Sequence, residues 1–419
     1  MAVTAQRLAP TPRAHPAPSA RTVVATLLGA TLVLKAGGFA FDFLGYYVGA
    51  AHGTTAAGTA LTLFGVGWCV GQAVCGAMTD RWGPRTTLTL WMGISALACL
   101  ALAMFRALPA LLAVALLLGF TMESQRPVIS AEIHERVTSE GGRTRVQSWM
   151  YWVTNVGVSV SGGLGGYLAH SHGYRMLFVL NGAACLVVAA IARRVLSPRR
   201  PVHTSGSRQL AYRQVLADPR LRWITAAAVG AMICAYGLIS VLPLTMSADG
   251  LPPTTYGTAM IANAAAVLVL SPPLTRFLVG RDDSVRYPIA PILAAGSLIL
   301  GAAMGFAALQ HTSIGYTVAA VVMVPGEICY SVAVGAFVAT AAPHAAAGRY
   351  QAVLSGAAAL ASLTPLGIAL ALNTGGRPLV AGLLATSALL AALSCRPLAR
   401  ALHAPRFPSP PVDVATLRA

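Results

Sequence analysis

The chain reads Gly76-Ala77-Met78-Thr79-Asp80-Arg81-Trp82-Gly83-Pro84-Arg85-Thr86 where one long apolar run ends and another begins. The two runs, 55–78 and 86–105, each reach the roughly 20 residues that a helix needs to cross a bilayer. The charged residues between them therefore predict a short loop joining two membrane spans. Gly83 suits a tight turn in that loop, and Gly76 allows close packing of a neighbouring helix.

Composition indicates a membrane protein along the whole chain. Of the 419 residues, 56% are hydrophobic and 10% are charged, against about 25% charged in soluble domains. Too few charges remain to cover the surface of a water-soluble protein. The net charge of +17 comes from basic residues scattered between apolar runs, so nucleic acid is not an expected partner. The seven cysteines all lie in apolar stretches, which favours free, buried thiols.

We predict an all-α polytopic membrane protein with twelve spans in two sets of six. A 6 + 6 arrangement around a long loop indicates internal duplication, with inverted three-helix repeats in each half. The domains are an N-terminal basic arm without fixed structure (1–21), a first half (22–195), a central loop (196–221), a second half (222–398) and a tail (399–419). The spans are 22–47, 55–78, 86–105, 108–132, 147–169, 175–195, 222–246, 255–279, 287–309, 313–340, 350–373 and 378–398.

The arginines set the expected orientation. With the N-terminus inside, 24 arginines fall in the inner segments and only three, Arg106, Arg175 and Arg377, in the outer ones. Basic residues are enriched in cytoplasmic loops. We therefore expect both termini in the cytoplasm of a bacterial cell whose inner membrane the chain crosses.

Five ionisable residues fall within predicted spans, where each costs about 2.5–3.5 kcal/mol at a helix centre. They are Lys35 and Asp42 in the first span, Glu123 and Arg126 in the fourth, and Glu327 in the tenth. Glu123 and Arg126 are neighbours on one helix face, so a structural ion pair and a gate are both open for them. Lys35 and Asp42 stand two turns apart, and Glu327 has no local partner.

For Asp42 and Glu327 we favour a functional role. The charged spans are the first helices of three-helix units, where symmetry places the lining of a central cavity. Burial favours the protonated form of an acid and a nearby cation favours the carboxylate. Asp42, Glu327 and Glu123 are thus predicted proton-coupling residues, with Lys35 and Arg126 as charge partners or gate.

The loop quoted first resembles the signature loop of the major facilitator superfamily. The shared residues are Gly76, Asp80, Arg81, Gly83 and Arg85, while Pro84 replaces one usual basic residue. In that family the loop latches the cytoplasmic side and governs the conformational switch. The resemblance implies a transporter that works by alternating access.

Two further spans resemble the drug:proton antiporter branch of that superfamily. The fourth carries Glu123-x-x-Arg126-Pro127, and the fifth carries Asn155, Gly157, Ser161, Gly162, Gly165 and Gly166 at the spacing of the antiporter motif. Members usually have Gly-Pro where this chain has Ser161-Gly162. The resemblance implies proton-coupled efflux of small drug-like or amphipathic molecules, and the missing proline keeps proton-coupled uptake of a nutrient as the alternative.

The expected substrate cavity lies between the halves, with Phe39, Tyr236, Asn263 and Tyr330 as its possible lining. We expect small molecules, protons and the lipid bilayer as partners, a monomer, and no cofactor or metal. The proton gradient is the expected energy source, because no phosphate-binding Gly-Lys-Ser/Thr loop is present. A membrane enzyme or a transport-dead receptor is the alternative of another class, and the lack of a nucleophile or metal motif argues against the enzyme.

Overall fold

A computed structural model gives the fold. It describes residues 20–122, 128–129, 132–133, 136–137, 140–196, 212–280, 285–342 and 347–403. Nearly all of these are α-helical, and none of them forms a strand. Most of the predicted arm, central loop and tail lies outside the described residues.

The first half contains seven helices within the described residues. Positive φ angles at Gly53 (84°), Gly83 (82°) and Gly173 (79°) make the tight turns between consecutive helices. A left-handed backbone of this kind costs least at glycine. The helices are α1 (Ala20–Ala36), α2 (Phe39–His52), α3 (Thr54–Trp82), α4 (Pro84–Met104), α5 (Leu108–Met122), α7 (Glu140–His172) and α8 (Tyr174–Val195).

The second half begins with a short helix and ends with one that bends sharply. Its last helix has a non-helical residue, Gly376 (φ 66°), so the backbone turns there. The helices are α9 (Tyr212–Ala217), α10 (Pro219–Ala235), η2 (Tyr236–Leu238), α11 (Val241–Ala248), α12 (Pro253–Leu278), α13 (Ile289–Leu309), α14 (Ser313–Val322), α15 (Val324–Ala341), α16 (Ala347–Ala361) and α17 (Pro365–His403).

The predicted membrane architecture is confirmed. Among the described residues, nine helical segments are long and apolar enough to cross a bilayer. One of these, Arg349–His403, is 55 residues long and contains the bend at Gly376. The apolar helix α5 is shorter than the nine. The count of twelve spans itself stays a prediction.

Three predicted spans are broken in the middle, which the apolar pattern did not reveal. The first breaks at Gly37 and Gly38 between α1 and α2, and the seventh breaks around η2. The tenth breaks at Met323, two residues before Pro325. Proline cannot donate the helical hydrogen bond and is tolerated only in the first turn of a helix, so α15 starts anew there.

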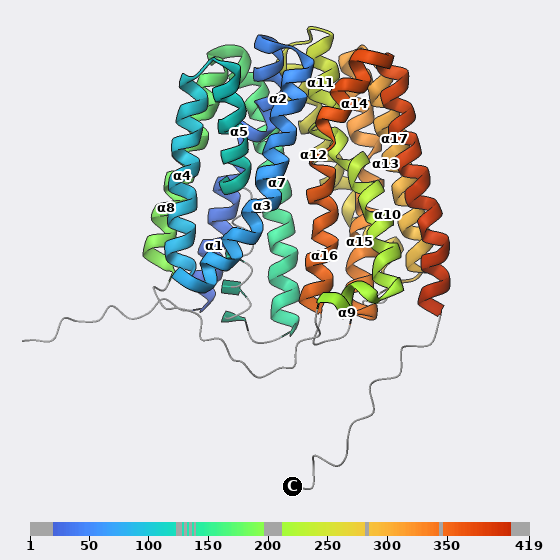
Figure 1. Ribbon diagram of the computed structural model, residues 1–419. Coiled ribbons are helices and arrows are strands. Elements are labelled where there is room, and N and C mark those ends of the chain that lie inside the picture. The colour runs from blue at the N-terminus through green and yellow to red at the C-terminus, as the bar shows by residue number, and fades with distance from the viewer. Residues whose placement is uncertain are drawn as a thin grey trace, which may run out of the picture.

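The bundle has two ends, which we name the Gly53 end and the α9 end. In Figure 1 the turn between α2 and α3 lies at the top and α9 at the bottom. At the Gly53 end one cluster of buried apolar residues includes helices of both halves. Towards the α9 end the described core residues form two separate clusters, one in each half. Among the described residues, the halves therefore share a buried core at the Gly53 end but not towards the α9 end.

Candidate functional site

Asp42 lies in the first turn of α2, directly after the break in the first span. Its side chain is buried, and the hydroxyl of Ser161 on α7 donates a hydrogen bond to its Oδ2. The Ser161 oxygen also lies 3.2 Å from the carbonyl oxygen of Val158. The hydroxyl therefore serves either form of the acid: it donates to the carboxylate, or it accepts from the protonated acid while donating to Val158.

The break before Asp42 is held by a residue that the sequence did not single out. Asn181, fully buried on α8, accepts a hydrogen bond from the backbone N–H of Ala40 at 2.8 Å. The first N–H groups of a helix have no partner within it, so a buried helix start needs such an acceptor. A lone asparagine in an apolar span was the signal available.

Glu327 has a similar local setting in the second half. It lies in the first turn of α15, after the break at Met323. Gly326 next to it packs against the backbone of Gly296 and against Leu300 on α13. The Glu327 side chain is half-buried and has no hydrogen-bond or ion-pair partner within the described part of the chain. Both predicted proton carriers thus stand at the start of a half-helix, where the helix dipole favours a negative charge.

One face of α7 packs against α1 and α2. A side chain at Gly157 would collide with Lys35 and the backbone of Ala36, and one at Gly165 would collide with the ring of Phe43. Ser161 lies between these glycines on the same face, because residues four apart stack along a helix. The motif glycines therefore bring Ser161 within reach of Asp42.

A second face of α7 packs against α12 of the other half. A Cβ at Gly162 would lie 2.7 Å from Met260, and one at Gly166 would lie 2.6 Å from the carbonyl oxygen of Pro253. At the same height the ring of Tyr256 packs edge-on against Phe43, with centroids 5.5 Å apart. The antiporter-motif residues thus form part of the seal at the Gly53 end, and Asp42 lies just behind it.

The signature loop lies at the α9 end. Gly83 makes the tight turn predicted for it. Asp80 and Arg81 are exposed and Arg85 is half-buried, and Asp80 has no recorded hydrogen-bond or ion-pair partner among the described residues. A Cβ on Gly76 would meet nothing within 4 Å. The close packing expected at Gly76 is therefore absent from this conformation, in which the two halves lack a shared core near that end.

The four predicted cavity residues have different environments. Phe39 is buried in the core beside Gly165. Asn263 is buried and donates to the carbonyl oxygen of Ala320 at 2.7 Å. Tyr236 stacks on Trp68 of the other half, and Tyr330 is half-buried. Phe39 and Asn263 are therefore occupied in packing or in a helix contact in this conformation, and their assignment to the substrate cavity stays a prediction.

Of the remaining predicted charged residues, Lys35 lies within the described part of the chain, whereas Glu123 and Arg126 do not. Lys35 is half-buried at the end of α1. The break at Gly37 and Gly38 separates it from Asp42, so the two do not share a helix face as a continuous span would require. Glu123 and Arg126 lie outside the described residues. Among the described residues, no group of three or more His, Cys, Asp or Glu side chains could hold a metal ion.

Comparisons with known proteins agree with this architecture. The sequence profile described as Major Facilitator Superfamily matches residues 27–365. No match was found among curated proteins.

Solved transporter structures share the fold at low sequence identity. The chain is similar to a POT family transporter in complex with 5-aminolevulinic acid (TM-score 0.70, 13% identity, 89% of this chain and 94% of that one). It is similar to the POT family transporter PepTSo (TM-score 0.70, 12% identity, 91% and 99%). It also resembles a bacterial homolog of the human lysosomal transporter Spinster in an inward-facing, occupied conformation (TM-score 0.67, 16% identity, 92% and 96%).

Proposed function

The chain belongs to the major facilitator superfamily of membrane transporters, and we propose that it exports small amphipathic or drug-like molecules in exchange for protons. One observation carries the proposal. Two carboxyl groups inside the bundle, Asp42 and Glu327, each stand in the first turn of a half-helix beside a break. Intramembrane acids of this kind mark proton and substrate pathways.

The placement of the arginines supports an orientation with the α9 end in the cytoplasm and the Gly53 end outside. In this orientation the halves share a core on the outer side, whereas their described core residues form separate clusters on the inner side. Transport then requires the opposite arrangement in the other half of the cycle. The glycine contacts of α7 with α12 would separate, and the loop at Gly76 would become packed.

The surroundings of the two acids support different tasks. Asp42 lies behind the outer seal and has Ser161 as a partner for both protonation states. Opening of the outer seal would expose Asp42 to external protons. Glu327 is partly accessible in this conformation, which suits exchange of protons with the cytoplasmic side. A carboxyl group that passes between wet and dry surroundings changes its proton affinity, and this couples protonation to the conformational change.

The test is dye uptake into inside-out vesicles with an acidic lumen, using a panel of fluorescent cations and neutral drugs. We expect gradient-driven accumulation by the natural chain and its loss in Asp42→Asn and Glu327→Gln, with normal folding and membrane insertion. Arg106→Gln, which removes an exposed charge outside the named motifs, serves as the comparison for a general effect of charge removal. Full transport by both intramembrane variants would rule out the proton-carrier roles.

Proton-coupled uptake is the second candidate. The solved structures that the chain resembles include POT family transporters, one of them with 5-aminolevulinic acid. Ser161-Gly162 in place of the usual Gly-Pro of antiporters also fits this candidate. Accumulation of a small peptide or amino-acid-like compound in right-side-out vesicles under an acid-outside gradient would favour uptake over export.

A further inference from the structure

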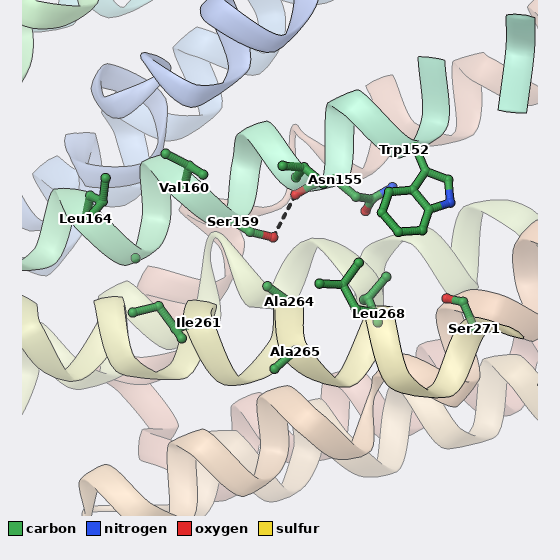
Figure 2. A pocket seen from close by; sticks show the side chains of 13 residues that line it. Trp152, Asn155, Ser159, Val160, Leu164, Ile261, Ala264, Ala265, Leu268 and Ser271 are labelled. Atoms are coloured by element: carbon green, nitrogen blue, oxygen red, sulfur yellow. Dashed lines mark hydrogen bonds between the residues drawn. The ribbon is translucent and has the colours of Figure 1, made fainter. Parts of the chain in front are cut away.

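An apolar groove runs between α7 of the first half and α12 of the second. Its volume is about 490 Å³, within the range of small-molecule sites. Figure 2 shows side chains of the two helices facing each other across it. Its lining includes Trp152, Leu164, Ile261 and Leu268, with Asn155 and Ser271 among the few polar residues.

The apolar walls of the groove are partly exposed. Trp152 is 48% exposed, and Ile261 and Leu268 are each 46% exposed. Because the exposed wall is apolar and belongs to helices of the membrane bundle, we infer that it faces acyl chains. A molecule dissolved in the membrane therefore reaches the groove without crossing water.

The groove is continuous with the contact between the two halves. A Cβ at Gly163 would lie 2.5 Å from Ile261, and one at Gly162 would lie 2.7 Å from Met260. Gly163 and Ile261 also line the groove, so it begins where the tight contact ends and extends towards the α9 end. Because the two walls belong to different halves, any movement of one half against the other changes its width.

One polar atom in the groove lacks a partner. The Ser271 hydroxyl oxygen is buried and has no hydrogen bond among the described residues. Ser159, by contrast, donates to the carbonyl oxygen of Asn155 at 2.7 Å. A buried polar group without a partner costs free energy unless a ligand supplies one. The wall is thus apolar along most of its length and offers a hydroxyl near one end, as Figure 2 shows.

We propose that this groove binds the apolar chain of an amphipathic transport substrate entering from the membrane, with the substrate's polar group near Ser271. The proposal rests on the proposed function and narrows it: the substrate is a single-chain amphiphile that reaches the protein laterally. Its polar group would supply the missing hydrogen bond, and its chain would cover the exposed apolar walls.

The test uses a long-chain primary alkylammonium, whose N–H groups can donate to the Ser271 hydroxyl oxygen. It carries bromine on the chain carbons next to the ammonium group, because bromine quenches nearby tryptophans and Trp152 lies at the same end of the groove as Ser271 (Figure 2). The full chain is placed in phosphatidylcholine vesicles and titrated with the probe. Trp152→Phe is compared with Trp149→Phe, because Trp149 is on the same helix and 56% exposed but does not line the groove. We expect a saturable quenching component that disappears in Trp152→Phe only and that an unbrominated analogue displaces.

Filling the groove gives the second readout. Ala265→Phe should weaken the saturable component about tenfold, whereas Val269→Phe, exposed on the same helix outside the groove, should leave it unchanged. Equal, unsaturable quenching in both tryptophan variants would overturn the proposal, since the groove would then be ordinary lipid-facing surface. Saturable binding combined with unchanged amphiphile transport by Ala265→Phe would also overturn it, in favour of a resident lipid. Quenching needs no gradient, so it reports on the groove even if proton coupling proves wrong.

Discussion

Asp249 and Arg377 form an ion pair with an N–O distance of 2.6 Å that joins the end of α11 to the bend in α17. Tyr316 donates to the other carboxylate oxygen at 3.0 Å and accepts from Arg377 at 2.9 Å. His311 lies 3.3 Å from the same carboxylate. The side chains of Asp249 and Arg377 are only 18% and 13% exposed. One carboxylate therefore ties together four segments of the second half at the Gly53 end.

Removal of this carboxylate should destabilise the protein. Asp249→Asn leaves the Arg377 guanidinium mostly buried without its counter-charge, and breaking a buried pair costs about 3–5 kcal/mol; the partial exposure of this pair places the expected loss near the lower figure. Arg377→Lys should also be destabilising, because an ammonium group cannot reproduce the planar fork of donors. Thermal unfolding in detergent measures both effects. If Asp249→Asn unfolded at the same temperature as the natural chain, a stabilising role for the pair would be contradicted.

The hydrogen bond from Ser161 to Asp42 predicts a change in the pH dependence of transport. In Ser161→Ala both forms of Asp42 lose a partner, and the carboxylate loses more, because a hydrogen bond between neutral groups is worth only about 0.5–1.5 kcal/mol. Protonation therefore persists to higher pH. Hydrogen bonds to charged groups are worth about 1.5–3 kcal/mol, and one pH unit corresponds to 1.36 kcal/mol. The midpoint of the transport–pH profile should therefore rise by about one unit.

Two comparisons sharpen this experiment. Ser161→Gly, which introduces the residue usual in antiporters, should shift the midpoint in the same direction. Ser297→Ala should leave it unchanged, because the buried Ser297 hydroxyl donates to the Leu293 carbonyl oxygen of its own helix and has no other partner among the described residues. A midpoint that is the same in all three variants would mean that Asp42 does not titrate during transport.

The sequence was informative where local chemistry determines the structure. Gly83 lies between two apolar runs beside charged residues, so its turn was predictable, and Asp42 and Glu327 stood out because acids are rare in apolar spans. The antiporter-motif glycines were identifiable by spacing. Their division between two neighbours, with Gly157 and Gly165 facing α1 and α2 and Gly166 facing α12, depends on tertiary packing.

Other features could not be predicted from the sequence, because they depend on distant residues or on interruptions of a helix. Hydropathy is averaged over a whole span, so it does not predict that the helix is interrupted at Gly37 and Gly38. The structural role of Asn181 is to accept a hydrogen bond from the backbone N–H of Ala40, which is 141 residues away in the sequence. Arg377 was predicted to be an outer-loop arginine, and its pairing with Asp249 required the helices to be placed in space.

The contact of Gly166 with α12 predicts that a single methyl group will disturb the seal. In Gly166→Ala the new Cβ would lie 2.6 Å from the Pro253 carbonyl oxygen and 2.9 Å from the Gly257 Cα. Both are backbone atoms that cannot rotate away, so the halves must separate at the Gly53 end. Tyr167 and Thr258 face each other across α7 and α12, with their hydroxyl oxygens 3.5 Å apart. Cysteines at these two positions should react with a short bifunctional maleimide several-fold more slowly in this variant. Gly93→Ala, where a Cβ meets nothing within 4 Å, is the control.

Gly76→Ala should have the opposite effect from Gly166→Ala, because it should favour the present conformation, closed at the Gly53 end. A Cβ on Gly76 meets nothing within 4 Å in this conformation, so Gly76→Ala should leave thermal stability unchanged and cross-linking of the same cysteine pair equal to or faster than in the natural chain. If closure of the α9 end brings a helix against Gly76, the added methyl group will hinder that closure, and transport should fall by about tenfold for each 1.4 kcal/mol of hindrance. Slower cross-linking, or transport at the natural rate, would mean that Gly76 is not packed in the alternate conformation. A decrease in transport without a decrease in cross-linking would instead place the signature loop at the closing interface of the α9 end.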